Sequence, residues 1–245
     1  MSRKKGGTVR TPGAAILAAA SAVGKKEHEG PLGGGFDFFD INDRFGQKTW
    51  EKSESEMQRI ALSGVIGKLG LNEGVIDAIF AGDLLNQCVG SAYGLLEFDV
   101  PYFGLYGACS TAAEGLMLSA MTVSAGLYKK CAAVTSSHNA SAERQYRMPL
   151  EYGGQRPPTA QWTVTGAGAF IVGKASDGTP GALIADVMPG VVVEKGIKDA
   201  SNMGAAMAPA AADTLKRHLF DTGRTVEDYD LIITGDLGSF GSELF

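Results

Sequence analysis

The chain has 245 residues, of which 44% are apolar and 20% are charged, and its net charge at pH 7 is -5. This length and composition can bury a sizeable core in one large domain or in two small ones. Lys and Arg are scattered, which excludes a basic surface for a phosphate backbone, so we expect no nucleic-acid partner. The three cysteines argue against a secreted disulfide framework, and their spacing relative to the three histidines matches no zinc pattern. We therefore expect reduced thiols, a cytoplasmic protein and no metal site.

Residues 14–24, AAILAAASAVG, form the first apolar segment, and a short basic stretch precedes them, as in a signal peptide. Only Ile16, Leu17 and Val23 in this segment are strongly apolar, and polar residues follow directly. A buried strand is the better interpretation. The apolar stretch 112–128 contains a glutamate and several Ser and Gly residues, so we expect no transmembrane helix there.

Helix and strand patterns then alternate along the chain. Apolar residues at helical spacing predict a helix over residues 48–71, and the apolar run IDAIFAGDLL predicts a buried strand. The same criteria predict a short helix at 87–96, a strand at 102–106, a helix at 110–127, a strand at 131–136 and a strand after residue 165. This alternation is typical of a parallel sheet covered by helices on both faces. Gly166 and Gly168 lack the third glycine of a dinucleotide fingerprint, so no nucleotide cofactor is expected.

The predicted helix at 110–127 has an unusual composition. Glu114 is its single charged residue, and small or apolar residues occupy all its sides. Such a helix is expected to be buried all round. It then needs layers of structure both above and below it, which a simple three-layer sandwich does not provide.

An ungapped shift of 153 residues aligns the chain with itself. It pairs Asp77 with Asp230 and Gly82 with Gly235, and it aligns the helix upstream of the first strand with a second helix predicted at 205–219. Helix, glycine, loop and strand in one register indicate a tandem duplication, with a second strand predicted at 230–234. The second copy is expected to be incomplete in this chain.

Parallel strands would bring three polar clusters to the edge formed by their carboxyl ends, where ligands of open α/β folds bind. The clusters are Asp83 with Asn86 and Gln87, Cys109 with Ser110 and Thr111, and Ser137 with His138 and Asn139. Free amides in the first turn of a helix would stabilise a thiolate at Cys109 or a bound anion. A small thiol also fits as plain core packing between a strand and a helix, and the pattern alone leaves both interpretations open.

A thiolate nucleophile normally needs a base within hydrogen-bond reach. Only His138 is placed to provide one, because His218 lies beside Lys216 and Arg217 on an amphipathic helix, where a solvated position is expected.

The segment 137–158 is the most polar part of the central chain. It is interpretable as an exposed loop with ordinary salt pairs. However, Arg144 and Arg147, together with a His, an Asn and two tyrosines beside an anion-accepting helix start, would suit a small planar dicarboxylate. Guanidinium groups bind carboxylates through paired hydrogen bonds.

Several motifs together resemble those of the stage V sporulation protein AD family, namely FGLYGACST, SSHNASAERQYR, TVTGAGA, MGAAMAPAAADT and DYDLIITGDL. The resemblance implies an α/β, thiolase-like fold with alternating layers of helix and sheet, built from two related halves. Residues 1–200, with the loop 137–165, would form the first half, and residues 201–245 would begin a truncated second half. In thiolase-like enzymes the nucleophile occupies the position of Cys109, and its partners come from the second half, so condensation chemistry is in doubt.

The resemblance also implies a non-catalytic function, the binding of dipicolinic acid and its uptake, with calcium as counter-ion, into the developing spore. The partners would be integral membrane proteins of a dipicolinate channel complex, and the chain would be a homodimer in the cytoplasm, peripheral to the inner forespore membrane. The resemblance implies no other cofactor. The implied ligand-binding residues are Cys109, Ser110, Thr111, His138, Asn139 and Arg144. The alternative is an acyltransferase of the thiolase or ketoacyl-synthase type that uses Cys109 as its nucleophile.

Overall fold

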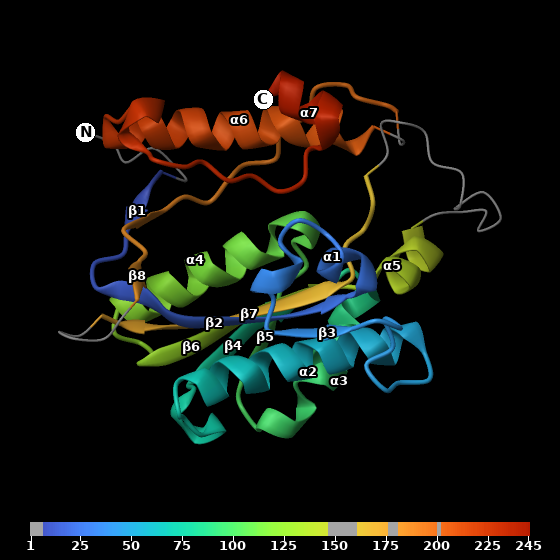
Figure 1. The fold of residues 1–245 in the computed structure, drawn as a ribbon. Coiled ribbons are helices and arrows are strands. Elements are labelled where there is room, and N and C mark those ends of the chain that lie inside the picture. Colours follow the sequence, from blue (N-terminus) through green and yellow to red (C-terminus); the bar gives the residue numbers. More distant parts are fainter. Residues whose placement is uncertain (1–6, 147–160, 176–180, 200–201) are drawn as a thin grey trace. The chain divides into compact units, whose positions relative to one another are not determined.

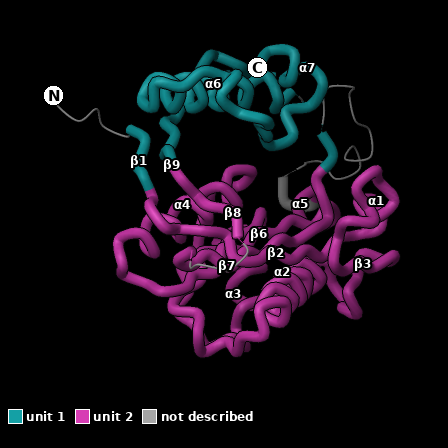
Figure 2. Tube along the Cα trace, turned by 60° about the vertical axis from the view of Figure 1, so that its left-hand side comes forward, with its two compact units in different colours: residues 1–10, 151–162, 186–245 teal, residues 11–150, 163–185 magenta. Residues whose placement is uncertain are grey.

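The chain folds as two compact units (Figure 2). The computed structural model describes residues 7–146, 161–175, 181–199 and 202–245. Residues 11–150 and 163–185 form one unit, which we call the sheet unit, and residues 1–10, 151–162 and 186–245 form the other, the terminal unit. The halves expected from the sequence, 1–200 and 201–245, divide the chain at a different place, because residues 186–199 belong to the terminal unit.

The sheet unit is built on a seven-stranded sheet (Figure 1) with the order β3-β2-β7-β6-β4-β5, in which β8 also pairs with β2. Its strands are β2 (Ala14–Gly24), β3 (Phe38–Asp40), β4 (Ala78–Gly82), β5 (Tyr102–Gly104), β6 (Lys130–Ser137), β7 (Gly166–Lys174) and β8 (Ala182–Leu183). β4 pairs in parallel with β5 and β6, and all of its residues are buried. A continuous run of buried residues is typical of a strand that is covered on both faces.

The sheet is mixed, which corrects the prediction of a parallel sheet. β4, β5 and β6 are parallel, whereas β7 is antiparallel to both of its neighbours, β2 and β6. β7 is inserted between the first long strand and β6, so the simple alternation of strand and helix ends after β6. The predicted strands at 14–24, 102–106, 131–136 and after residue 165 are confirmed as β2, β5, β6 and β7.

Helices cover both faces of this sheet (Figure 1). α2 (Trp50–Lys68) and α3 (Val89–Gly94) lie on one face, and α4 (Thr111–Ser124) lies on the other. α2 begins after Thr49, whose Oγ1 accepts a 3.3 Å hydrogen bond from the Lys52 amide, and it ends before Gly70, which has a φ of 59°. Both features are common helix boundaries. The buried face of α2 contributes Met57, Ala61, Leu62 and Val65 to the main core.

α4 is not buried on all sides, contrary to the prediction for this segment. Its buried residues form one stripe, and the rest of the helix is half-buried or exposed. Gly115 in this stripe lets the helix approach β6 closely, since a Cβ at position 115 would lie 3.2 Å from the Cβ of Ala133. Contact with the sheet therefore decides which side of α4 is buried. The lack of charged residues on the other side does not make that side buried.

The terminal unit contains a two-stranded antiparallel ladder and two helices. β1 (Val9–Arg10) pairs with β9 (Asp186–Val187), and α6 (Met203–Thr222) packs against α7 (Gly238–Leu244). The two helices are close at Gly204, where a Cβ would overlap the carbonyl oxygen of Leu237. Among the described residues, no helix is both long enough and apolar enough to cross a membrane.

Two elements of the terminal unit lie 153 residues after their counterparts in the sheet unit, the same shift that aligns the sequence with itself. α6 begins at Met203, 153 residues after Trp50 of α2, and the short 3-10 helices Glu73–Val75 and Val226–Asp228 are also 153 residues apart. The strand predicted at 230–234 is wrong, because these residues form no strand and Leu231 and Ile233 are 72% and 82% exposed. β4, the counterpart of residues 230–234, is hydrogen-bonded to a parallel strand on each side. Within the described part of the chain, no strand pairs with residues 230–234.

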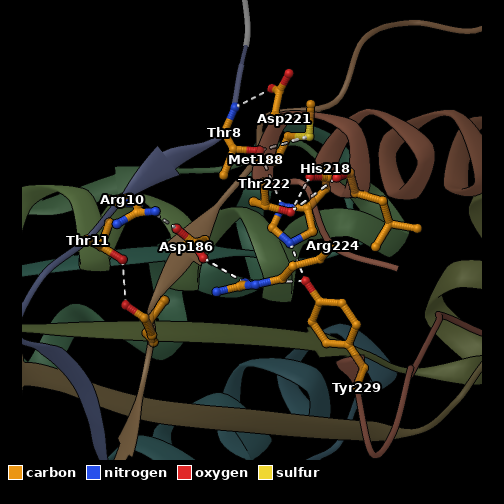
Figure 3. A network of polar contacts seen from close by, with 12 residues as sticks. Thr8, Arg10, Thr11, Asp186, Met188, His218, Asp221, Thr222, Arg224 and Tyr229 are labelled. Atoms are coloured by element: carbon orange, nitrogen blue, oxygen red, sulfur yellow. Dashed lines mark hydrogen bonds and ion pairs between the residues drawn. The ribbon is translucent and has the colours of Figure 1, made fainter. Parts of the chain in front are cut away.

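A polar network in the terminal unit connects the amino-terminal strand to α6 (Figure 3). The ring nitrogens of His218 lie 3.3 Å from Thr8 Oγ1 and 2.8 Å from the Tyr229 hydroxyl. Arg224 donates a 3.0 Å hydrogen bond to Asp186. His218 is thus half-buried and engaged at both nitrogens, and the expectation of a solvated histidine was wrong because loops of the same unit cover that side of α6.

Candidate ligand-binding site

The three polar clusters predicted from the sequence lie at one edge of the sheet. β5, β4 and β6 are neighbouring parallel strands, so their carboxyl ends lie at the same edge. Asp83 follows β4, the turn 105–110 follows β5, and His138 follows β6. Because β4 lies between the other two strands, Cys109 and His138 follow strands that are not neighbours in the sheet.

The turn after β5 presents Cys109 at the surface. Residues Ala108–Ser110 form a 3-10 helix that leads directly into α4. Ala108 has a φ of 46°, a left-handed conformation that costs about 1–2 kcal/mol for a residue with a Cβ. Cys109 is exposed, and Ser110 Oγ donates a 2.8 Å hydrogen bond to the Gly107 carbonyl. Cys109 is therefore not part of the core of the sheet unit.

The start of α4 has two features that favour an anion. No side chain among the described residues caps its amino terminus, and the Ser110 and Thr111 amides donate to the Gly107 and Ala108 carbonyls of the preceding turn. Thr111, the first residue of α4, is 1% exposed, and its Oγ1 has no hydrogen-bond partner in the part of the chain that the structure describes. A buried hydroxyl without a partner costs about 1–3 kcal/mol, and in native proteins such groups usually bind a water or an ion.

One negative group lies close to this helix start. Glu114, the only charged residue of α4, folds back toward Gly107, where a Cβ would overlap Glu114 Oε2. The dipole of α4 attracts this carboxylate as it would attract a bound anion. Glu114 therefore competes with an anionic ligand at this position.

The backbone holds His138 at both ring nitrogens. His138 is 1% exposed, its Nε2 lies 2.8 Å from the Asp43 carbonyl oxygen, and its Nδ1 accepts a 3.1 Å hydrogen bond from the Ala140 amide. These contacts match a neutral ring with its proton on Nε2, and burial lowers the pKa of His138. In this conformation His138 offers neither a base for Cys109 nor a free donor for a ligand.

The two remaining predicted residues lie on α5 (Asn139–Tyr146). Asn139 Nδ2 donates a 3.1 Å hydrogen bond to the Thr163 carbonyl, and its backbone amide donates to Thr165 Oγ1 at 3.0 Å. The Arg144 side chain lies outside the described residues. The ligand-binding roles of Asn139 and Arg144 therefore remain predictions.

A buried polar network beside this site was not found from the sequence. Glu54 and Gln58 of α2 are fully buried and are hydrogen-bonded to serines of β6, α3 and α5. The two residues are four positions apart, on the helix face that also carries Met57 and Ala61. Polar residues within an apolar helical stripe are the sequence signal that could have revealed the network. The described residues contain no group of three or more His, Cys, Asp or Glu side chains that could hold a metal ion.

Comparisons with known proteins give both a family and a fold. The family model for stage V sporulation protein AD (SpoVAD) matches residues 7–245. Stage V sporulation protein AD of Bacillus subtilis (strain 168) is 45% identical over 230 residues, which are 94% of this chain and 67% of that protein.

Solved structures with a similar fold are thiolase-like enzymes. OleA of Xanthomonas campestris has a TM-score of 0.61 at 13% identity, covering 96% of this chain and 80% of that chain. 3-oxoacyl-(acyl carrier protein) synthase III of Xanthomonas oryzae pv. oryzae also has a TM-score of 0.61 at 13% identity, covering 96% of this chain and 81% of that chain. At this identity the likeness shows the fold alone. With a family model that matches nearly all of its residues and a relative that is 45% identical, the chain belongs to the stage V sporulation protein AD family.

Proposed function

We propose that this chain is a non-catalytic, thiolase-like binding protein that holds dipicolinate, the dianion of pyridine-2,6-dicarboxylic acid, during its uptake into the developing spore. The observation that carries the proposal is the start of α4, where a buried Thr111 hydroxyl without a partner among the described residues lies at a helix amino terminus that no described side chain caps. Hydroxyl and amide groups are uncharged hydrogen-bond donors, and such donors bind anions.

The groups that would hold the ligand differ in how directly the structure supports them. Ser110, Thr111 and the amides near Cys109 would bind one carboxylate at the helix start. Asn139 and Arg144 on α5 would contribute from the end of β6, which β4 separates from β5. His138 would support the backbone, because both of its ring nitrogens already have partners.

Acyl transfer by Cys109 is the second candidate function. The exposed thiol on a strained turn favours it, since this geometry presents a nucleophile at a helix start. The engaged ring of His138 argues against it, because the thiol lacks that base. An acyl adduct on Cys109 after incubation with acyl-CoA, detected by mass spectrometry, would establish the acyltransferase instead.

The proposed partners are supported by the family resemblance and by one edge of the sheet. We propose a homodimer that docks on integral membrane proteins of a dipicolinate channel complex at the inner forespore membrane. β5 is an edge strand of the sheet that the structure describes, and Phe103 on this strand and Tyr106 just after it are exposed. An exposed edge with aromatic residues supports pairing with a second copy.

We also propose that the two units descend from a tandem duplication. The equal spacing of α2 and α6 and of the two 3-10 helices supports this origin.

Isothermal titration calorimetry with dipicolinate, with and without calcium, tests the binding function. Pyridine-2,5-dicarboxylate is the matched control ligand, because it has the same charge with a different angle between its carboxylates. Saturable heat with dipicolinate and none with the control ligand is expected. No heat at millimolar dipicolinate would refute the proposal.

A further inference from the structure

The buried network beside the site centres on Glu54 of α2. Its side chain is 0% exposed, and both carboxyl oxygens have partners: Ser136 Oγ lies 3.0 Å from Oε1 and Ser141 Oγ lies 2.8 Å from Oε2. Ser136 is near the end of β6, and Ser141 is in the first turn of α5. Glu54 therefore connects α2 to the strand end and to the helix that carry part of the proposed site.

The network continues to a second buried carboxylate. Gln58 Nε2 lies 2.8 Å from Ser136 Oγ and 2.9 Å from Ser91 Oγ. Ser91 donates from its hydroxyl and its amide to Asp83 Oδ2, at 2.6 and 2.7 Å. Asp83 is 2% exposed and follows β4. An unbroken chain of hydrogen bonds thus joins α5 to the carboxyl end of the central strand.

This network contains two carboxyl groups and no basic side chain among the described residues. The segment after β4 contributes Asp83 and Cys88, β5 contributes Tyr102, and β2 and β7 pack apolar residues against α2. On α5, Glu143 accepts a hydrogen bond from Thr163. The hydrogen bonds of His138, just before α5, match an uncharged imidazole ring. Two buried carboxylates without a counter-charge disfavour double ionisation, so one of them is expected to keep its proton.

The hydrogen bonds around Ser141 leave a place for that proton on Glu54, whose carboxyl also has a hydrogen bond to the Leu84 backbone. Ser141 has one hydroxyl hydrogen, but its Oγ lies 2.8 Å from Glu54 Oε2 and 3.1 Å from the His138 carbonyl, and both oxygens are acceptors. The His138 carbonyl also accepts a 2.9 Å hydrogen bond from the Ala142 amide. With Glu54 ionised, the single Ser141 hydroxyl hydrogen bonds either the carboxylate or the carbonyl. With Glu54 protonated on Oε2, Glu54 donates to Ser141, which donates to His138, and both Ser141 contacts are hydrogen bonds. Burial raises the pKa of Glu54 to about 7, and the charge of Asp83 contributes to the rise.

We propose that Glu54 is a positioning residue whose protonated form fixes the first turn of α5 and thereby sets the geometry of the ligand site. The role in ligand binding rests on the proposed function. The ligand class stays the same, but the proposal adds a regulation: the site is in its binding arrangement while Glu54 is protonated, and ionisation loosens α5 from α2. Cys88 and Tyr102 do not titrate in this range because burial raises the pKa of each, and His138 titrates at lower pH because burial lowers its pKa.

The test compares Glu54→Gln with Glu56→Gln across pH 6–8. The amide introduced by Glu54→Gln can donate to Ser141 as the protonated acid does, whereas Glu56 is a carboxylate of the same helix that pairs with Arg59 outside the network. If only the protonated form binds, the affinity of the native protein for dipicolinate should fall about tenfold from pH 6 to pH 8, as expected for a single proton with a pKa near 7. Glu54→Gln should change less than about twofold, and Glu56→Gln should follow the native profile.

A measurement without ligand separates this proposal from the binding function. Infrared difference spectra between the native protein and Glu54→Gln should show a protonated carboxyl at pH 6 that is lost by pH 8. Backbone hydrogen exchange in residues 139–143 should become faster relative to Glu54→Gln over the same range. These two results would support the switch even if dipicolinate does not bind. A carboxylate signal for Glu54 already at pH 6, or identical exchange in the two proteins at every pH, would overturn it.

Discussion

Replacing Thr111 by Val separates the cost of the buried hydroxyl from its use in binding. Valine keeps the branched shape of threonine and replaces only the hydroxyl by a methyl group. Thr111 is 1% exposed and its Oγ1 has no partner, while a Cβ at Gly82 would lie 2.9 Å from Thr111 Cγ2, so the methyl group is already packed against β4. The substitution therefore removes a desolvated polar atom and preserves the packing.

The two effects should have opposite signs. Without ligand, removal of the unsatisfied hydroxyl should raise the free energy of unfolding by about 1–2 kcal/mol, which is the lower part of the range of about 1–3 kcal/mol that a buried unsatisfied group costs. With ligand, the lost hydrogen bond to a carboxylate is worth about 1.5–3 kcal/mol, which corresponds to roughly 10- to 100-fold weaker dipicolinate binding. A substitution that stabilises the protein and weakens binding is difficult to explain by damage to the fold.

Ser119→Ala is the matched control for this experiment. Ser119 lies on the same stripe of α4, is 0% exposed, and also has an Oγ without a partner, but it is two turns away from the helix start. It should stabilise the protein by a similar amount and leave the affinity unchanged. Urea unfolding and calorimetric titration provide the two readouts. Unchanged affinity in Thr111→Val, or equal losses in both variants, would show that the start of α4 is not the anion site.

Four further predictions follow from the same contacts. Glu114→Gln should tighten dipicolinate binding about two- to fivefold in titrations at low salt, because it removes a negative charge beside the helix start, and weaker binding would contradict this placement. Cys109→Ala should change the dipicolinate affinity less than about threefold, since the proposed anion contacts are backbone amides and not the thiol, and a large loss of affinity would implicate the sulfur directly. The native protein should also form no acyl adduct with acyl-CoA. Gly94→Ala should destabilise the protein by about 1–3 kcal/mol in urea unfolding, because a Cβ there would lie 2.5 Å from the Ser55 carbonyl oxygen, whereas Gly67→Ala, at a helix position with open space, should stabilise it by about 0.5–1 kcal/mol. The free energy of unfolding should fall by about 3 kcal/mol between pH 4.5 and pH 7 through Glu54, since the folded protein retains a proton that the unfolded chain has released, and Glu54→Gln should lack this component.

The positions of most elements could be predicted from local patterns. The apolar runs at β2 and β4 and the capped amphipathic helix α2 are specified by residues that lie within a few turns of one another. The placement of Asp83, Cys109 and His138 at the same edge of the sheet also followed from parallel strands, because parallel strands end on the same side. These predictions need only the period of each element and the direction of its strands.

The predictions that failed depend on which neighbour is present. The uncharged composition of α4 predicted burial all round, but only the stripe with Gly115 and Ser119 faces a sheet. The apolar run at 230–234 matches β4 in sequence, yet it forms no strand without partners for its backbone hydrogen bonds. Strand formation and burial both require a second surface, which a local pattern does not specify.

The sequence by itself determined the family, the order of the elements and the placement of Cys109, Ser110 and Thr111 at the start of a helix, because these depend on motifs and on short-range spacing. Only the tertiary structure decided that His138 has no free nitrogen, that Thr111 Oγ1 is left without a partner, and that Glu54 is buried between two serines from distant segments. The hydrogen bonds of His138 and Glu54 depend on partners that are far away in the chain, 95 residues in the case of His138 and Asp43. Hydrogen bonding and burial are properties of the packed environment, and packing brings those partners together only when the chain folds.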